Sequence, residues 1–366
     1  MRRRYNMQMK LASLALVVAL AAIGGSAAAK PPPLPKTKTR ATPGLIEALA
    51  LDGSRVAYDV AGSYGARTRC NTVYVWNVRR NATTRVSGRP TCLADNSSTG
   101  AGVRELALDG GRVAWIVNQG GNSESRDSLY VSSPAGSRER LVASAFRTGD
   151  VSAILTGNWL GGLVGAGSFL GVDHWATDSG GTVNSVRLEK VGARLADLAG
   201  GTETMLAEST DGRAVAVLRQ DGSLGVYSTR GALLRTILPQ HGVTEVALRG
   251  DYLATLTTAD TLEVYNSHSG RRVRTWRVAH GARSLDISSG LAVYAAPFPS
   301  GGYTRVVHVR RLLGGQDRVL ATTPPQLEHV QLEPVGLAYA FNRIAANRPG
   351  AVVFVPMSRV VRAARG

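Results

Sequence analysis

Two stretches of the chain decide the fold: LALDGSRVAY at residues 49–58 and LALDGGRVAW at residues 106–115. In each stretch an alternating apolar run leads to an Asp-Gly pair, and a second apolar run follows. Asp-Gly pairs favour tight hairpin turns because glycine readily adopts a positive φ angle. The two stretches therefore predict two copies of one β-hairpin.

Weaker copies of this hairpin follow along the chain, centred on Gly157, Asp211-Gly212, Gly250, Gly290 and Gly336. Each copy is followed by a third apolar run, and most copies by a fourth. Copies that recur at intervals of about 46 residues match the period of four-stranded propeller blades. We therefore predict an all-β fold, a seven-bladed β-propeller of four-stranded antiparallel blades. A β-sandwich or a pair of barrels is the alternative, but radial closure explains the period better because it leaves few open edges.

Two of the later copies carry a family resemblance. GSLGVYSTRGALLRT at residues 222–236 and TLEVYNSHSGRRVRT at residues 261–275 resemble the second half of WD40-type repeats. The Trp-Asp pair of that family falls at Tyr227-Ser228 and Tyr265-Asn266, so the aromatic residue is kept and the acid is replaced. The usual Gly-His pair is absent. The resemblance is to WD40-like propellers of the bacterial TolB or YVTN type, and it implies one propeller over about 320 residues.

The N-terminus is typical of an export signal. Arg2, Arg3, Arg4 and Lys10 precede an apolar run at residues 11–23, which is shorter than the roughly 20 residues of a membrane-spanning helix. Small residues up to Ala29 are suitable for cleavage, so we expect a signal peptide at residues 1–29; a retained anchor helix is the alternative. A Pro-rich basic linker is expected at residues 30–44 and the propeller at residues 45–366.

These features predict the location of the mature protein. We expect it to be secreted or extracytoplasmic, in the periplasm or cell wall of a bacterium. After cleavage of the signal peptide we expect no membrane span.

The formal net charge of +17 is partly a property of the N-terminus. Eight of those charges lie in residues 1–40, which contain no acid, so the rest of the chain carries +9. The sequence has neither an RNA-binding aromatic motif nor a basic helix, so we expect no nucleic-acid partner. A basic exterior can still attract cell-wall polymers or anionic lipid.

The two cysteines, Cys70 and Cys92, lie symmetrically about Asn81. In an antiparallel hairpin centred there they would lie opposite each other. An exported protein meets oxidising conditions, so we predict a disulfide between them.

Catalytic signatures are missing from the sequence. The histidines are isolated from one another, and no metal motif, nucleophile elbow, phosphate loop or cofactor fingerprint is present. We therefore predict no metal and no cofactor. The innermost strands of a propeller line its channel, and Glu105, Glu245 and His329 have similar registers there. These three residues form a predicted polar collar that could bind a ligand.

Trp76, Trp115, Trp159, Trp175 and Trp276 fall on or beside predicted strands, where packing between blades is the favoured interpretation. Trp159 and Trp175 could instead edge a carbohydrate or peptide surface.

The chain's two ends allow a prediction about closure. Residues 45–51 should lie beside the last sheet, and residues 359–361 are the only C-terminal candidate for a further strand.

Two classes of function remain. The first is an exported, monomeric, non-catalytic propeller that binds an unknown extracytoplasmic protein or a cell-envelope polymer. The alternative is a propeller enzyme of the lactonase or lyase type, with acid, base and metal ligands converging at the central channel.

Overall fold

The computed structural model describes most of the chain from residue 36 onward. The described ranges are 36–61, 68–88, 91–94, 100–120, 124–136, 139–149, 156–177, 183–192, 194–201, 205–219, 221–297, 304–323, 326–343 and 348–366. The predicted signal peptide lies outside the described residues. Within these ranges, no helix combines the length and the apolar character that crossing a membrane requires.

The described strands form six antiparallel sheets. The first contains β2 (Leu49–Asp52), β3 (Arg55–Val60), β4 (Thr68–Asn77) and β5 (Ala82–Arg85), with β6 (Thr91–Ala94) paired to β4. An eight-stranded sheet follows, made of β7 (Gly100–Asp109), β8 (Arg112–Gly120), β9 (Glu124–Ser132), β10 (Arg140–Thr148), β11 (Thr156–Ala166), β12 (Phe169–Thr177), β13 (Val183–Val191) and β14 (Leu195–Gly201).

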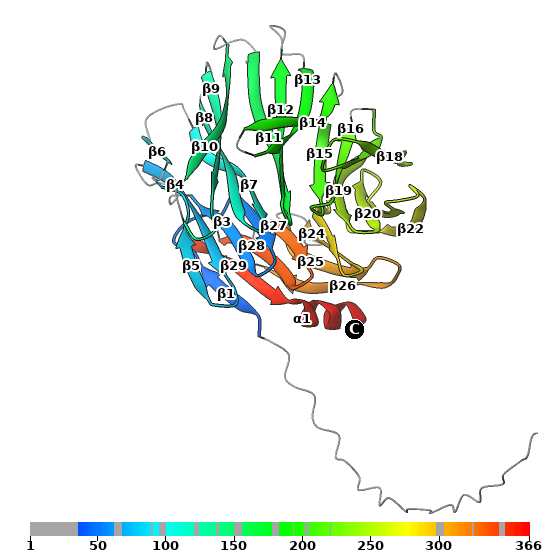
Figure 1. Cartoon of the computed structure of the whole chain (residues 1–366). Coiled ribbons are helices and arrows are strands. Elements are labelled where there is room, and N and C mark those ends of the chain that lie inside the picture. Colours follow the sequence, from blue (N-terminus) through cyan, green and yellow to red (C-terminus); the bar gives the residue numbers. More distant parts are fainter. Residues whose placement is uncertain are drawn as a thin grey trace, which may run out of the picture. The chain divides into compact units, whose positions relative to one another are not determined.

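The other sheets each have four strands (Figure 1). They are β15 (Met205–Thr210), β16 (Ala214–Arg219), β17 (Leu224–Ser228) and β18 (Leu233–Ile237); β19 (Val243–Arg249), β20 (Tyr252–Thr257), β21 (Thr261–Asn266) and β22 (Arg272–Arg277); β23 (Arg283–Ser288), β24 (Leu291–Pro297), β25 (Thr304–Arg311) and β26 (Gly314–Thr322); and β27 (Leu327–Glu333), β28 (Gly336–Arg343), β29 (Arg348–Pro356) and β1 (Lys38–Ala41).

The repeated hairpins lie where the sequence predicts them, with one exception. The turn between β2 and β3 contains Gly53, and the turn between β19 and β20 contains Gly250, both with positive φ. The prediction of a turn at Gly157 is wrong, because that residue pairs with Arg147 at the start of β11. The turn lies at Gly167, whose φ is 61°. This stretch is rich in glycine and lacks an Asp-Gly pair, so the pattern did not mark the right position.

The inner strand of each hairpin, defined here as its first strand, contacts the inner strand of the next. Contacts run from β2 to β7, then to β11, β15, β19, β23 and β27, and β27 contacts β2 in turn. The eight-stranded sheet contributes two of these inner strands, β7 and β11, because β10 pairs with β11 and joins the two halves.

Strands from both ends of the chain meet in the last sheet. β1 pairs with β29, with Thr39 opposite Val353, and Figure 1 shows the blue β1 beside the red β29. β2 contacts β27 and β28, so the prediction that residues 45–51 lie beside this sheet is confirmed. Lys38–Ala41 falls inside the stretch expected to be linker, so the structure moves the start of the fold from residue 45 back to this strand.

The prediction of a strand at residues 359–361 is wrong. These residues belong to the helix α1 (Met357–Arg365), which packs against β25, β26 and β28. Val360 and Ala364 are buried, four positions apart and therefore on one helix face. The chain ends after little more than two turns, so the helical period was too short to recognise from sequence.

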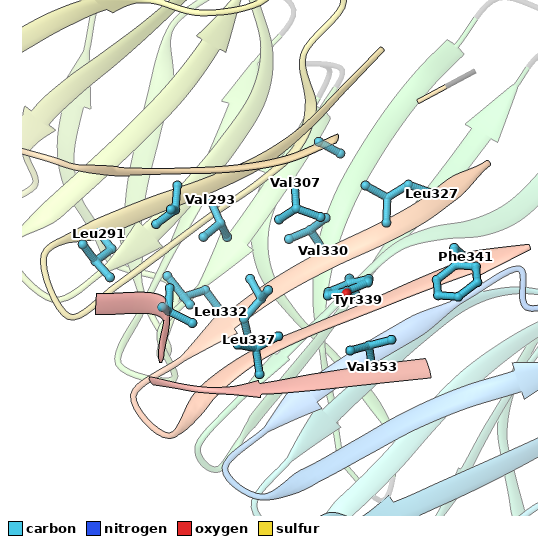
Figure 2. Close-up of a cluster of buried hydrophobic side chains, with 14 of the residues drawn as sticks. Leu291, Val293, Val307, Leu327, Val330, Leu332, Leu337, Tyr339, Phe341 and Val353 are labelled. Atoms are coloured by element: carbon cyan, nitrogen blue, oxygen red, sulfur yellow. The ribbon is translucent and has the colours of Figure 1, made fainter. Parts of the chain in front are cut away.

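The largest core cluster lies between the last two sheets (Figure 2). Val293 and Val307 of one sheet meet Val330 and Tyr339 of the other. Alternating residues of each strand supply this layer, as expected where two sheets pack face to face.

Candidate functional site

The inner strands surround a cavity of ≈ 360 Å³. Its lining residues come from all the inner strands named above, β2, β7, β11, β15, β19, β23 and β27. Leucine, alanine and valine residues line it together with a smaller set of polar residues. We call this space the central cavity, and it is the place where the sequence predicted a polar collar.

The structure places two of the three collar residues on the cavity wall. Glu245 and His329 line it, whereas Glu105 does not belong to its lining. Glu105 instead accepts a hydrogen bond from the backbone N–H of Leu163 on the neighbouring strand β11. Glu245 likewise accepts hydrogen bonds from the backbone of Ser284 and Leu285 on β23.

His329 also connects two neighbouring segments, but its side chain is the hydrogen-bond donor rather than the acceptor. Its Nε2 donates to the carbonyl of Glu47 at 2.8 Å, so it joins β27 to the segment that enters β2. Burial lowers the pKa of His329, and it raises the pKa of Glu105 and of Glu245. Each collar side chain thus connects one inner strand to the next.

A second level of side chains repeats this arrangement nearer the hairpin turns. The backbone N–H of Leu248 donates to Oγ of Ser209 at 2.9 Å, and that of Leu332 donates to Oδ2 of Asp286 at 2.7 Å. The N–H of Leu51 donates to Oε1 of Gln331. In all, side chains bridge five neighbouring pairs of inner strands within the described residues.

An arginine spans two sheets at this level. Arg249 of β19 forms an ion pair with Glu333 of β27, and β23 with its Asp286 lies between these strands. Burial raises the pKa of Glu333 to about 7 and that of Asp286 to about 6, although Arg249 opposes both shifts. Burial also raises the pKa of Asp52. Glu333, Asp286 and Arg249 all line the cavity, so two carboxyl groups and a guanidinium group share its wall.

Sequence reasoning found part of this set. Glu245 and His329 were predicted, but Ser209, Arg249, Gln331 and Glu333 were missed. The sequence did contain a clue to Arg249 and Glu333, because each is a charged residue at the end of an inner strand, just before a turn. Among the described residues, no three His, Cys, Asp or Glu side chains are grouped closely enough to hold a metal ion.

The tryptophans divide into two groups. Trp76 and Trp115 are fully buried between sheets, as predicted. Trp159 and Trp175 stack on each other with ring centroids 5.3 Å apart, and Arg147 covers Trp159 at 5.0 Å. Trp276 lies under Arg310 at 4.2 Å. Trp159 and Trp175 lie opposite each other on β11 and β12 of one sheet, and a carbohydrate or peptide surface at this pair stays a prediction.

The backbone pairing of β4 with β6 places Cys70 opposite Cys92, so the predicted register is confirmed. The side chains of both residues lie outside the described part of the structure. The disulfide stays a prediction.

Comparison with known proteins supports the fold rather than an activity. No family model matches the chain, and no curated protein matches it in sequence. A chain in a crystal structure of the mitotic checkpoint complex is similar, with a TM-score of 0.51 and 16% identity over 87% of this chain and 93% of that one. The structural neighbours include WD40-type propellers. The fold is WD40-like.

Two further solved structures have lower scores. BamB from Moraxella catarrhalis has a TM-score of 0.45 at 11% identity, covering 85% of this chain and 86% of that one. The computationally designed Ika8 protein has a TM-score of 0.47 at 15% identity, covering 86% of this chain and 98% of that one.

Proposed function

We propose that this WD40-like chain is an exported, seven-bladed, TolB- or YVTN-type propeller without catalytic activity, which binds an extracytoplasmic protein or a cell-envelope polymer. The succession of contacts among the inner strands supports the blade number, because the eight-stranded sheet counts as two blades. The apolar run at residues 11–23 supports export. Loops and outer strands would then carry recognition.

One observation carries the non-catalytic part of this proposal: polar side chains of the inner strands are used in holding blades together. Glu105, Glu245 and Asp286 accept hydrogen bonds from the backbone of the neighbouring strand. A general base must reach a proton on its substrate, and a carboxylate whose lone pairs are occupied by backbone N–H groups is poorly suited to that role. Recognition on the exterior leaves these contacts intact.

The proposal can be tested by photo-crosslinking in cells. A photoreactive amino acid is placed either at exposed outer positions, such as Leu141, Leu234 and Leu313, or at Gln331 in the cavity wall. We expect adducts with extracytoplasmic components from outer positions. A reporter enzyme lacking its own signal, fused after residue 44, should be active outside the cytoplasm. Adducts formed only from Gln331, or a reporter retained inside, would contradict the proposal.

A second function, that of a propeller enzyme of the lactonase or lyase type, is favoured by one feature. Glu333 lines the central cavity, and its pKa of about 7 suits acid–base catalysis near neutral pH. Turnover of a lactone or an acidic polysaccharide that is lost in Glu333→Gln would establish this function in place of the first.

A further inference from the structure

The outer strands of two neighbouring blades have the same register but different exposed side chains. In β18, Leu233 lies opposite Tyr227 and Arg235 opposite Val226, with a register shift between the two pairs. In β22, the same shift separates Arg272 opposite Tyr265 from Arg274 opposite Val264. The two strands are therefore equivalent, and their side chains can be compared position by position.

That comparison shows one protected edge and one unprotected edge. β22 presents arginines at residues 272, 274 and 277, which are exposed. At the equivalent positions, β18 presents Leu233 and Arg235, and Leu238 follows the strand. Both leucines are exposed, and the exposed fraction of Leu238 is 77%. Charged side chains on an edge strand discourage pairing with other chains. The β18 edge lacks most of that protection.

The backbone of β18 is also available on its outer side. Its sheet runs in the order β15-β16-β17-β18, so β18 pairs with β17 alone among the described strands. An edge strand presents a row of N–H and C=O groups to which an extended segment can add. Leu233, Leu234 and Leu238 would supply apolar contacts along such a segment.

The charge on β18 indicates which segment fits. Arg235 lies on the strand itself, and Gly270, in the turn between β21 and β22, packs against it. Arg271 and Arg274 follow that turn but line a groove with Leu313 of the next sheet, so Arg235 is the charge that β18 itself carries. Arg235 forms no ion pair with a carboxylate among the residues described. A guanidinium group without a carboxylate partner favours a carboxylate on an incoming chain.

The same charge argues against pairing with a second copy. Arg235 is the middle residue of β18. A symmetric antiparallel pair of two β18 strands would place Arg235 opposite its own copy, and like charges directly opposite each other destabilise a pair of strands.

We propose that β18 is a strand-addition site for an extended segment of a partner protein in which acidic and apolar residues alternate. This inference rests on the proposed binding function and narrows it to a protein partner and to one edge of one blade. Main-chain hydrogen bonds would provide affinity, and the leucines and Arg235 would select the sequence.

The test uses the purified full chain and two labelled eight-residue peptides, one alternating glutamate with valine and the other alternating lysine with valine. Fluorescence anisotropy measures affinity, and amide hydrogen exchange locates the bound peptide. We expect the glutamate peptide to bind at least about tenfold more tightly than the lysine peptide, since Coulomb attraction changes sign, and to protect amides of β18.

Substitutions then identify the contacts. Leu233→Ser combined with Leu238→Ser should weaken binding of the glutamate peptide at least about tenfold, because two exposed leucines would lose their apolar contacts. Arg235→Glu should also weaken it. Leu313→Ser, at an exposed leucine of another blade, is the matched control and should change nothing. Thermal unfolding of each variant confirms that it folds.

Three results would overturn the inference: equal affinity for the two peptides, affinity unaffected by the leucine substitutions, or a dimer in sedimentation that the leucine substitutions dissociate. The last would make a second copy the occupant. The crosslinking experiment separates this inference from the proposed function. Adducts from other outer positions but not from Leu234 would reject the β18 site alone, and no adducts from any outer position would reject both.

Discussion

The inner and outer strands of this molecule use their polar chemistry in different ways. On the inner strands, Asp286 and Ser209 each accept a hydrogen bond from the backbone of the next blade. On the outer strands, Leu233 and Leu238 are exposed beside a backbone edge that no described strand covers. The difference teaches that polar residues near the centre of a ring can be structural, whereas exposed apolar residues at its rim are better candidates for recognition.

The largest expected effect comes from breaking the ring where the two ends of the chain meet. Deleting residues 352–366 removes α1 and most of β29, the strand that joins β1 to β28. An open ring exposes the apolar faces of two neighbouring sheets, so we expect loss of the cooperative thermal transition, measured by calorimetry. Deleting residues 1–29 is the control and should leave the transition unchanged. A soluble truncated protein with unaltered thermal stability would contradict the single-ring account.

The next largest effect on stability is expected from the predicted disulfide between β4 and β6 of the first sheet. Replacing Cys70 with Ser should lower the free energy of unfolding of the oxidised protein by about 3 kcal/mol, because a disulfide that closes a loop of this size restricts the unfolded chain. Chemical denaturation measures the change. The Cys92→Ser variant, alone or combined with the first, should give the same loss. Two reactive thiols per native chain in a titration would show that no disulfide forms.

Loss of a single hydrogen bond between inner strands should lower the free energy of unfolding somewhat less than loss of the disulfide. Asp286→Ala leaves the buried N–H of Leu332 without its acceptor, which should cost about 1–3 kcal/mol. Asp251→Ala is the matched control, because that carboxylate is exposed and, among the residues described, pairs only with the exposed His268. Equal stability of the two variants in chemical denaturation would mean that the inner bridges do not hold the blades.

The cavity carboxyls should make stability depend on pH. The folded state holds the proton of Glu333 up to a pKa of about 7, above its ordinary value of 4.5. Between those values the folded state binds more protons than the unfolded state, so the free energy of unfolding should fall as pH rises. Asp286 adds to the fall up to about pH 6. Glu333→Gln should make the slope shallower, and an unchanged slope would assign the pH dependence to other groups.

The smallest effect on stability is expected at the outer edge. Leu238→Ser should change the free energy of unfolding by less than about 0.5 kcal/mol, because the side chain is exposed. A larger loss in chemical denaturation would show that Leu238 packs within the protein, and the comparison between inner and outer strands would then fail at this residue.

Sequence pattern predicted the inner part of the fold better than its outer and terminal parts. Hairpins with Asp-Gly, such as the one at Gly53, are visible because turn chemistry and two-residue alternation coincide there. The turn at Gly167 was missed because the surrounding glycines gave no unique position, and β1 was missed because a four-residue edge strand carries little pattern.

The candidate site was predicted only in outline. The register of Glu245 and His329 indicated the cavity wall, but their hydrogen bonds depend on how neighbouring blades are offset, and single-strand patterns contain no such information. The ion pair between Arg249 and Glu333 joins residues far apart in sequence, and only the ring of inner strands brings them together.

The most direct test of the central claim is amide hydrogen exchange, measured residue by residue in the native protein and in Asp286→Ala. If inner-strand side chains hold neighbouring blades, the amide of Leu332 should be strongly protected in the native protein and should exchange much faster in the variant. Amides on the outer side of β18 should exchange quickly in both. Unchanged protection of Leu332 in the variant would contradict the claim that these polar side chains hold the ring together.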